Sequence, residues 1–240
     1  PIHYGRHRHL EKGKDIMQEV EPEWLLNLPD YSEWLTPERL DKEEVAWEEA
    51  KFEDAYLKPL VVLLLRRDCH SIIECGSGTG RVYKRSKEYF RMHKDINPRT
   101  LFYVGFDKNP ECIRRADSGS VYFQADIRDV KFSSQDISCA FAFLKHFGLH
   151  EWDSILKKVL SLSSRYSVFT QPIAEEDKDT GTEFHHVFVT KEHVLRVLEE
   201  EEFQCLQSYP LTRQMPEWMF VVERMSSFVV ERMSSVDGSL

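Results

Sequence analysis

The chain has 240 residues, of which 41% are apolar, and its formal net charge is −9 at pH 7. This length and apolar content predict one globular domain with a core of ordinary size and argue against a second full domain. The acidic balance disfavours sequence-independent binding to nucleic acid, although a local basic face leaves such binding open.

Membrane insertion and secretion are not expected. The longest apolar run, Leu60 to Leu65, is far shorter than the roughly 18 residues of a membrane helix. The segment from Pro1 to Lys14 is basic and lacks the apolar centre of a signal peptide. The five cysteines are scattered and form no CxxC pair, which favours reduced thiols over a disulfide framework or a zinc site. These features predict a cytoplasmic protein.

The first 56 residues are expected to form a helical cap. Short aromatic-rich pieces punctuated by proline come first, and Thr36-Pro37-Glu38 carries an N-cap signature into a charged helix that includes Tyr56. Pro59 is expected to start a second, more apolar helix that ends at Arg66-Arg67. The aromatic side chains of the cap either pack on one side of the core or close over a substrate as a lid.

A glycine-rich loop follows in the sequence Ser71-Ile-Ile-Glu-Cys-Gly-Ser-Gly-Thr-Gly-Arg81. The short apolar run before the glycines predicts a buried strand from Ser71 to Glu74. Gly76, Gly78 and Gly80 can take positive φ and allow the backbone to approach a ligand closely. The residues after Arg81 have helical spacing, so the loop amides meet a helix N-terminus that favours a carboxylate or phosphate.

The spacing of the glycines excludes two common nucleotide motifs. A dinucleotide fingerprint requires its third glycine at the position of Arg81. A P-loop requires Gly-Lys followed by Ser or Thr, and neither Gly76 nor Gly80 begins such a motif. On its own, the loop is also compatible with a glycine-rich turn that has no chemical role.

Two further strands are expected to end in carboxylates. The apolar run from Leu101 to Phe106 precedes Asp107, about twenty to thirty residues beyond the glycine loop, where α/β cofactor folds place an acceptor for ribose hydroxyls. The alternative for Asp107 is an exposed turn residue. The run from Val121 to Ala125 precedes Asp126 in the same way, and Asp129 is an alternative acid nearby.

The rest of the chain alternates strand with helix, which predicts a parallel sheet covered on both faces. Further strands are predicted from Ile137 to Phe143 and from Tyr166 to Thr170, and helices near Arg81, Pro110 and Trp152 and from Lys191 to Glu201.

The C-terminus contains an identical repeat of eight residues, Phe220–Ser227 and Phe228–Ser235. The first copy is expected to pair with the segment from Phe203 to Tyr209 as an antiparallel hairpin. The second copy has no place in that sheet, so residues 228–240 are interpreted as a duplicated tail.

The order of the glycine loop, Asp107 and Asp126 resembles that of class I S-adenosylmethionine (SAM) dependent methyltransferases. The resemblance implies a Rossmann-like, seven-stranded, mostly parallel α/β sheet with helices on both faces and an antiparallel C-terminal hairpin strand, formed by residues 57–227. It also implies SAM as cofactor, with the loop holding its methionine part, Asp107 the ribose, Asp126 the adenine amine and Ile127 the adenine ring. The implied cofactor residues are Glu74, Gly76, Ser77, Gly78, Thr79, Gly80, Arg81, Asp107, Lys108, Asp126, Ile127 and Phe141.

The predicted fourth strand ends in Phe141-Ala-Phe-Leu144, where amino-methylating nucleic-acid enzymes of this superfamily carry an Asp/Asn-Pro-Pro-Tyr/Phe motif. This departure disfavours methylation of a base amine. Many small-molecule members have a histidine a few residues on, where this chain has His146; the alternative is a satisfied histidine at a helix start. His185 and His186 are further candidates for a base that takes a proton from a hydroxyl or ammonium, whereas a carboxylate acceptor needs no base.

The sequence therefore predicts an enzyme, a SAM-dependent methyltransferase that acts on an O, N or carboxylate acceptor of a small molecule. The alternatives are a protein or RNA methyltransferase that docks through its basic helix, and an inactive interaction module with the same fold. No metal is expected, because His146, His150 and Asp153 lack a further ligand. The oligomeric state is not indicated.

Overall fold

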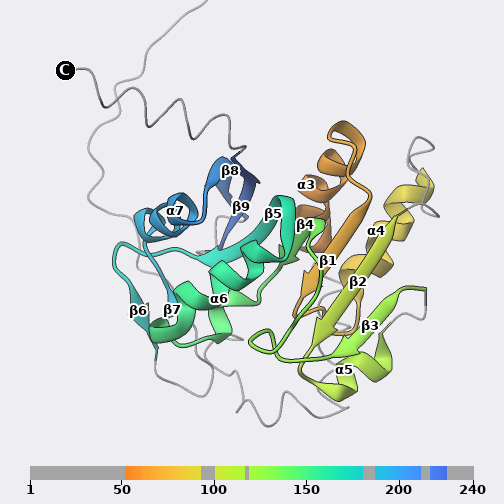
Figure 1. Ribbon diagram of the computed structural model, residues 1–240, viewed down its shortest axis with the longest axis horizontal. Coiled ribbons are helices and arrows are strands. Elements are labelled where there is room, and N and C mark those ends of the chain that lie inside the picture. The colour runs from red at the N-terminus through yellow and green to blue at the C-terminus, as the bar shows by residue number, and fades with distance from the viewer. Residues whose placement is uncertain (1–51, 93–100, 117–118, 181–186, 212–216, 226–240) are drawn as a thin grey trace, which may run out of the picture.

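The computed structural model describes residues 52–92, 101–116, 119–180, 187–211 and 217–225. Its main feature is a seven-stranded sheet with helices on both faces (Figure 1). The strands are β1 (Ser71–Cys75), β2 (Phe102–Asp107), β3 (Val121–Gln124), β4 (Gln135–Ala140), β5 (Ser163–Pro172), β8 (Phe203–Pro210) and β9 (Glu217–Arg224). The helices are α3 (Phe52–Arg66), α4 (Arg81–Met92), α5 (Pro110–Arg115), α6 (Leu149–Ser161) and α7 (Lys191–Glu200), with a 3₁₀ turn, η2 (Leu144–His146).

The strand order β3-β2-β1-β4-β5-β9-β8 confirms the predicted fold class. The first five strands in this order are parallel, and β9 lies antiparallel between β5 and β8. The chain moves outward from β1 to β2 and β3, then returns to place β4 on the other side of β1. This reversal creates a topological switch point at the carboxyl ends of β1 and β4, where such sheets bind ligands.

Two apolar layers hold the helices to the sheet. On one face, Leu57 and Leu60 of α3 and Val82 of α4 pack with Ile72 of β1. On the other face, residues of α6 and α7 pack with the stacked rings of Phe169 and Phe220. Because both faces are covered, the central strands are buried along most of their length and do not alternate between buried and exposed residues.

Helix α3 corrects the expectation that Pro59 starts a new helix. A single helix runs from Phe52 to Arg66 with Pro59 inside it. Proline lacks the N–H group that would bond to the preceding turn. The buried side chains of Tyr56, Leu57 and Leu60 nevertheless continue one apolar face across the proline, so packing on the sheet compensates for the missing bond. The expected boundary at residue 57 falls within this helix, and residues 1–51 of the expected cap lie outside the described residues.

Other boundaries differ from the predictions by a few residues. Strand β4 ends at Ala140 instead of Phe143, because Ala142 has a φ of +49°, which no extended strand accommodates. Helix α6 begins at Leu149, before Trp152. A short hairpin of β6 (Lys178–Asp179) and β7 (Val187–Phe188), following β5, was not expected.

The first copy of the C-terminal repeat contributes its beginning to β9, as expected, and β9 pairs with β8. The second copy lies outside the described residues. No helix in the described ranges has the length and apolar character needed to cross a membrane.

Candidate functional site

The glycine loop joins β1 to α4 at the switch point. Gly76, Gly78 and Gly80 have φ values of +67°, +52° and +76°, in the left-handed region that favours glycine. The backbone N–H of Ser77 donates to the carbonyl of Phe106 over 2.9 Å. The end of β2 therefore holds the loop in place.

The surroundings of the three glycines differ. A Cβ atom on Gly76 would overlap the ring of Phe143, and one on Gly80 would lie 2.6 Å from the hydroxyl of Tyr122. A Cβ atom on Gly78 would meet nothing within 4 Å, so the loop is open on that side. The hydroxyl of Ser77 is buried and has no hydrogen-bond partner among the described residues. An open backbone face beside an unsatisfied hydroxyl fits a polar ligand.

Asp107, the last residue of β2, contacts this open part of the loop. Its Oδ2 accepts a hydrogen bond from the backbone N–H of Gly78 over 3.0 Å, and its Oδ1 accepts one from the N–H of Asn109 over 2.9 Å. Burial raises the pKa of Asp107, and the hydrogen bonds from Asn109 and Gly78 partly offset this rise. Both carboxylate oxygens keep lone pairs for further donors. The neighbouring Lys108 is exposed, and its carbonyl accepts from Gln124.

Glu74 lies below the loop, on the face of the sheet that α3 covers. Its side chain is 3% exposed and accepts a hydrogen bond from the hydroxyl of Tyr103. Burial raises the pKa of Glu74 from 4.5 to about 8, although the Tyr103 hydrogen bond and the charge of Arg81, the first residue of α4, act in the opposite direction. The carboxyl group is therefore mostly protonated at neutral pH.

Asp126 follows β3, next to the end of β2, because Asp107 is paired with Gln124. Its Oδ1 accepts from the backbone N–H of Arg128 over 3.0 Å and its Oδ2 from the Arg128 guanidinium over 2.8 Å. The same guanidinium bonds to Glu151 of α6 and lies over the ring of Phe147 at 5.5 Å. Arg128 thus fixes the orientation of Asp126.

Ile127 and Asp129, which follow the predicted adenine acid Asp126, have other surroundings. Ile127 is 2% exposed and belongs to the core on the α6 side of the sheet. The backbone N–H of Asp129 donates to the carbonyl of Asp126 over 3.0 Å. The structure thus places Ile127 among core side chains.

Aromatic side chains line the chain after β4. The ring of Phe141 is 8% exposed and stacks on Tyr56 of α3 with centroids 5.0 Å apart. The ring of Phe143 packs on Gly76 and meets Phe147 edge to face at 4.9 Å. His146 ends η2 and is half-buried, and its backbone N–H donates to the carbonyl of Phe143. His185 and His186 lie outside the described residues.

Several neighbours of the glycine loop were missed by the sequence analysis. Phe143 and Tyr122 crowd Gly76 and Gly80, and Thr170 of β5 accepts a hydrogen bond from the backbone N–H of Ala142 over 2.7 Å. The Thr170 hydroxyl in turn bonds to Glu217 of β9. Phe143 and Thr170 are the last residues of predicted strands, which was their one signal, whereas Tyr122, the second residue of its predicted strand, carried none.

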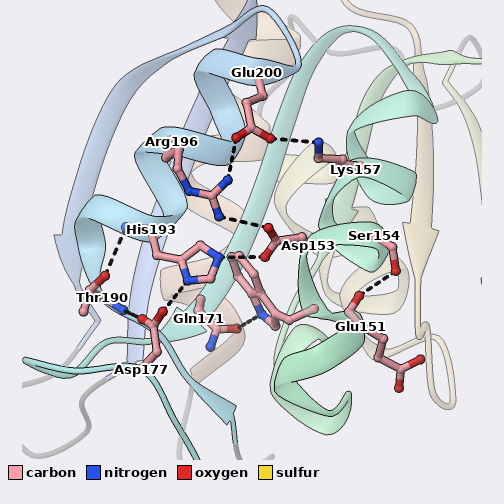
Figure 2. A network of polar contacts seen from close by, with 11 residues as sticks. Glu151, Asp153, Ser154, Lys157, Gln171, Asp177, Thr190, His193, Arg196 and Glu200 are labelled. Atoms are coloured by element: carbon pink, nitrogen blue, oxygen red, sulfur yellow. Dashed lines mark hydrogen bonds and ion pairs between the residues drawn. The ribbon is translucent and has the colours of Figure 1, made fainter.

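A second polar cluster lies between α6 and α7 (Figure 2). The ring of His193 is placed between two carboxylates, with Nε2 2.6 Å from Asp153 and Nδ1 2.5 Å from Asp177. Arg196 bonds to Asp153 and to Glu200. Asp153 is thus engaged with α7 and does not join His146 and His150, and the described ranges contain no group of side chains suited to a metal ion. This cluster ties both helices to the segment after β5.

Comparisons with known proteins show the fold. No family model matches the chain, and no curated protein matches it. Magnesium protoporphyrin IX methyltransferase from Synechocystis PCC 6803, solved with S-adenosylhomocysteine (SAH), is 10% identical with a TM-score of 0.60, covering 80% of this chain and 97% of that chain.

Two further solved structures have similar scores. Mitomycin 7-O-methyltransferase is 11% identical with a TM-score of 0.60, covering 84% of this chain and 62% of that chain. The 1,6-didemethyltoxoflavin-N1-methyltransferase of Burkholderia thailandensis, solved with its acceptor and SAH, is 12% identical with a TM-score of 0.57, covering 82% of this chain and 89% of that chain. The chain therefore has the fold of class I SAM-dependent methyltransferases.

Proposed function

We propose that the protein is a SAM-dependent methyltransferase that acts on a small molecule. The observation that carries this proposal is the hydrogen bond from the Gly78 amide to Asp107, because it joins the glycine loop to the carboxylate suited to ribose. The open side of Gly78 and the unsatisfied Ser77 hydroxyl fit the same cofactor. The similar structures named above support it, since their names state methyl transfer to small molecules.

The residues that would hold SAM can be assigned from their chemistry. The loop from Gly76 to Arg81 would bind the methionine part through backbone amides and the Ser77 hydroxyl. Asp107 would accept hydrogen bonds from the ribose hydroxyls, and Asp126, oriented by Arg128, would accept from the adenine amine. When bound, SAM supplies a methyl group that is activated by its positively charged sulfur.

Residues of the protein would position the acceptor, exclude water and, where the acceptor requires it, remove a proton. Holding an acceptor in line with the methyl group contributes up to roughly 7–11 kcal/mol to lowering a barrier. Phe141 and Phe143, on either side of the turn after β4, would exclude water from that place. His146, at the end of η2, would take a proton from a hydroxyl or ammonium group of the acceptor. His185 and His186, outside the described residues, are further candidates for this role.

Calorimetric titration with SAM tests the proposal. We expect binding to the unaltered protein, and about ten- to a hundredfold weaker binding to Asp107→Ala and to Gly78→Arg, because the first removes acceptors for the ribose and the second fills the open side of the loop. Glu199→Ala, which removes an exposed carboxylate of α7, serves as a matched control. Unchanged affinity in both site variants would refute the assignment.

A labelled-methyl assay separates the remaining possibilities. Incubation with labelled SAM and a metabolite extract should give a small labelled product. Label that appears only in protein or RNA fractions would support a macromolecular acceptor instead. Binding of SAM without any transfer would support an inactive module with this fold.

A further inference from the structure

Tyr122 of the edge strand β3 reaches the glycine loop from the neighbouring strand, although it lies outside the predicted cofactor residues. Strand β3 lies next to β2, and Tyr122 is paired there with Gly105 (Figure 1). Glycine within a strand often marks a place where another group approaches closely. A Cβ atom on Gly105 would lie 2.7 Å from Cε1 of Tyr122, so the tyrosine ring lies across this glycine.

The end of the Tyr122 side chain packs against the loop itself. A Cβ atom on Gly80 would lie 2.6 Å from the Tyr122 hydroxyl oxygen and 2.8 Å from Cζ. Gly80 has a φ of +76° and directly precedes α4. The hydroxyl oxygen is buried, although the tyrosine as a whole is only half-buried. Gly105 and Gly80 thus leave room for one and the same side chain.

Ser77, at the other end of the turn, rests on Gly105 as well. The Cβ atom on Gly105 would lie 2.8 Å from Cβ of Ser77. The Ser77 N–H donates to the carbonyl of Phe106 over 2.9 Å, and the Ser77 carbonyl accepts from the N–H of Gly80 over 2.9 Å. Tyr122 therefore contacts the turn directly at Gly80 and covers the glycine that supports Ser77.

We propose that the ring of Tyr122 is a positioning group, which holds the turn from Ser77 to Gly80 in the shape that binds the methionine part of SAM. This inference rests on the proposed function and adds to it a residue that the cofactor does not need to touch. Glycine loses more conformational freedom on ordering than any other residue, so a side chain that orders the turn in advance lowers the cost of binding.

The ribose contact should depend less on this ring. Asp107 accepts a hydrogen bond from the turn, at Gly78, but its other oxygen accepts one from Asn109, outside the turn. A loosened turn should therefore weaken binding of the amino-acid part of the cofactor more than binding of its nucleoside part. Adenosine and SAH separate the two effects, because adenosine lacks the amino-acid part.

Calorimetric titration of Tyr122→Leu with both ligands tests the proposal. Leucine can cover Gly105 but is too short to reach Gly80. We expect SAH to bind at least about tenfold more weakly to this variant, and adenosine less than about threefold more weakly. A general loss of stability would weaken both ligands alike. Tyr122→Phe keeps the ring and should bind both ligands within about threefold of the unaltered protein.

Hydrogen exchange tests the same positioning without a ligand. The Gly80 amide should exchange at least about tenfold faster in Tyr122→Leu than in the unaltered protein. The Gln135 amide, which bonds to Leu162 at the start of β4, should not change and serves as the reference. Tyr209→Leu is the matched control, because it makes the same change in β8, the opposite edge strand, and should alter neither measurement.

Selective loss of SAH binding together with faster exchange at Gly80 would support the inference. An unchanged ratio of SAH to adenosine affinity in Tyr122→Leu, or an unchanged exchange rate at Gly80, would overturn it, as would an equally large loss in Tyr122→Phe. If Tyr122→Leu does not fold, Gly105→Ala decides, because its methyl group displaces the ring and should lower the same ratio. Failure of SAH to bind to the unaltered protein would instead count against the proposed function.

Discussion

The substitution Glu74→Gln should change how the stability of the protein depends on pH. The pKa of Glu74 is raised from 4.5 to about 8 in the folded protein, chiefly by burial. The folded state therefore holds this proton more tightly than the unfolded chain. The resulting contribution to stability is fully present below pH 4.5 and is lost as the pH rises towards about 8.

The size of the effect follows from the two pKa values. Each pKa unit corresponds to about 1.4 kcal/mol, so an ionised Glu74 costs the folded protein roughly 5 kcal/mol. Between pH 5 and pH 9 the unaltered protein should lose about 4 kcal/mol of stability through this group. Glutamine cannot ionise, and its amide oxygen can still accept the hydrogen bond from Tyr103.

Urea unfolding followed by circular dichroism at pH 5, 7 and 9 measures this difference. We expect similar stability of the two proteins at pH 5 and an advantage of about 4 kcal/mol for Glu74→Gln at pH 9. Glu192→Gln, an exposed glutamate in the first turn of α7, should follow the unaltered protein at every pH. Parallel pH profiles for the Glu74 variant and the unaltered protein would refute the conclusion that burial controls this carboxyl group.

Three further substitutions test other parts of the structure. Gly76→Ala should destabilise the protein by about 2–4 kcal/mol in urea unfolding, because the added methyl group meets the Phe143 ring and the φ of residue 76 is +67°. In Gly78→Ala the space around the added methyl group is open. A smaller loss of stability in Gly76→Ala than in Gly78→Ala would contradict this prediction. His146→Ala should slow methyl transfer more than it weakens SAM binding by calorimetry, and a variant with full turnover would remove His146 from the reaction. His193→Gln should cost about 1–3 kcal/mol, because glutamine cannot reproduce the contacts of both ring nitrogens. Despite burial, hydrogen bonds from Arg196 and His193 hold the pKa of Asp153 below its usual range. The stability lost in His193→Gln should therefore shrink as the pH falls below about 4 and Asp153 is protonated. A stability loss that does not depend on pH would show that packing alone is affected.

The fold could be predicted because its signals are local. Strands β1, β2 and β3 are short, largely apolar runs that reach a glycine or an acid at their last residue or within two residues of it, and the acids Asp107 and Asp126 recur at the ends of β2 and β3. Parallel strands bring such ends to one edge of the sheet. The bond between Asp107 and Gly78 confirms that the sequence pattern corresponds to proximity in space.

The continuation of α3 through Pro59 could not be predicted in the same way. Local propensity favours a break at proline by roughly 3 kcal/mol. The opposing contribution comes from side chains such as Leu57 and Leu60, which are buried against strands that occur later in the chain. The local sequence reveals the helix-breaking tendency of Pro59 but not the burial of Leu57 and Leu60, because the strands that cover them come later in the chain.

The turn after β4 shows a similar limit. Period-2 alternation would place Phe141 and Phe143 on the same face of one strand. The positive φ of Ala142 breaks that alternation, so Phe141 packs on Tyr56 and Phe143 on Gly76. The residue that supports the break, Thr170, is 28 positions away, and Glu217 is a further 47 positions on. No spacing rule connects residues at such distances.

Polar groups buried near the carboxyl ends of β1 and β5 cost the folded protein free energy, and their position bears on function. The hydroxyl of Ser77 lacks a partner among the described residues, and Glu74 and Glu217 are carboxyl groups removed from water. An apolar residue in any of these places would serve packing better. All three are near the carboxyl ends of β1 and β5, at the edge that holds the glycine loop. Buried carboxyl groups that gather at one edge of the sheet are expected where side chains are retained for a ligand instead of for stability.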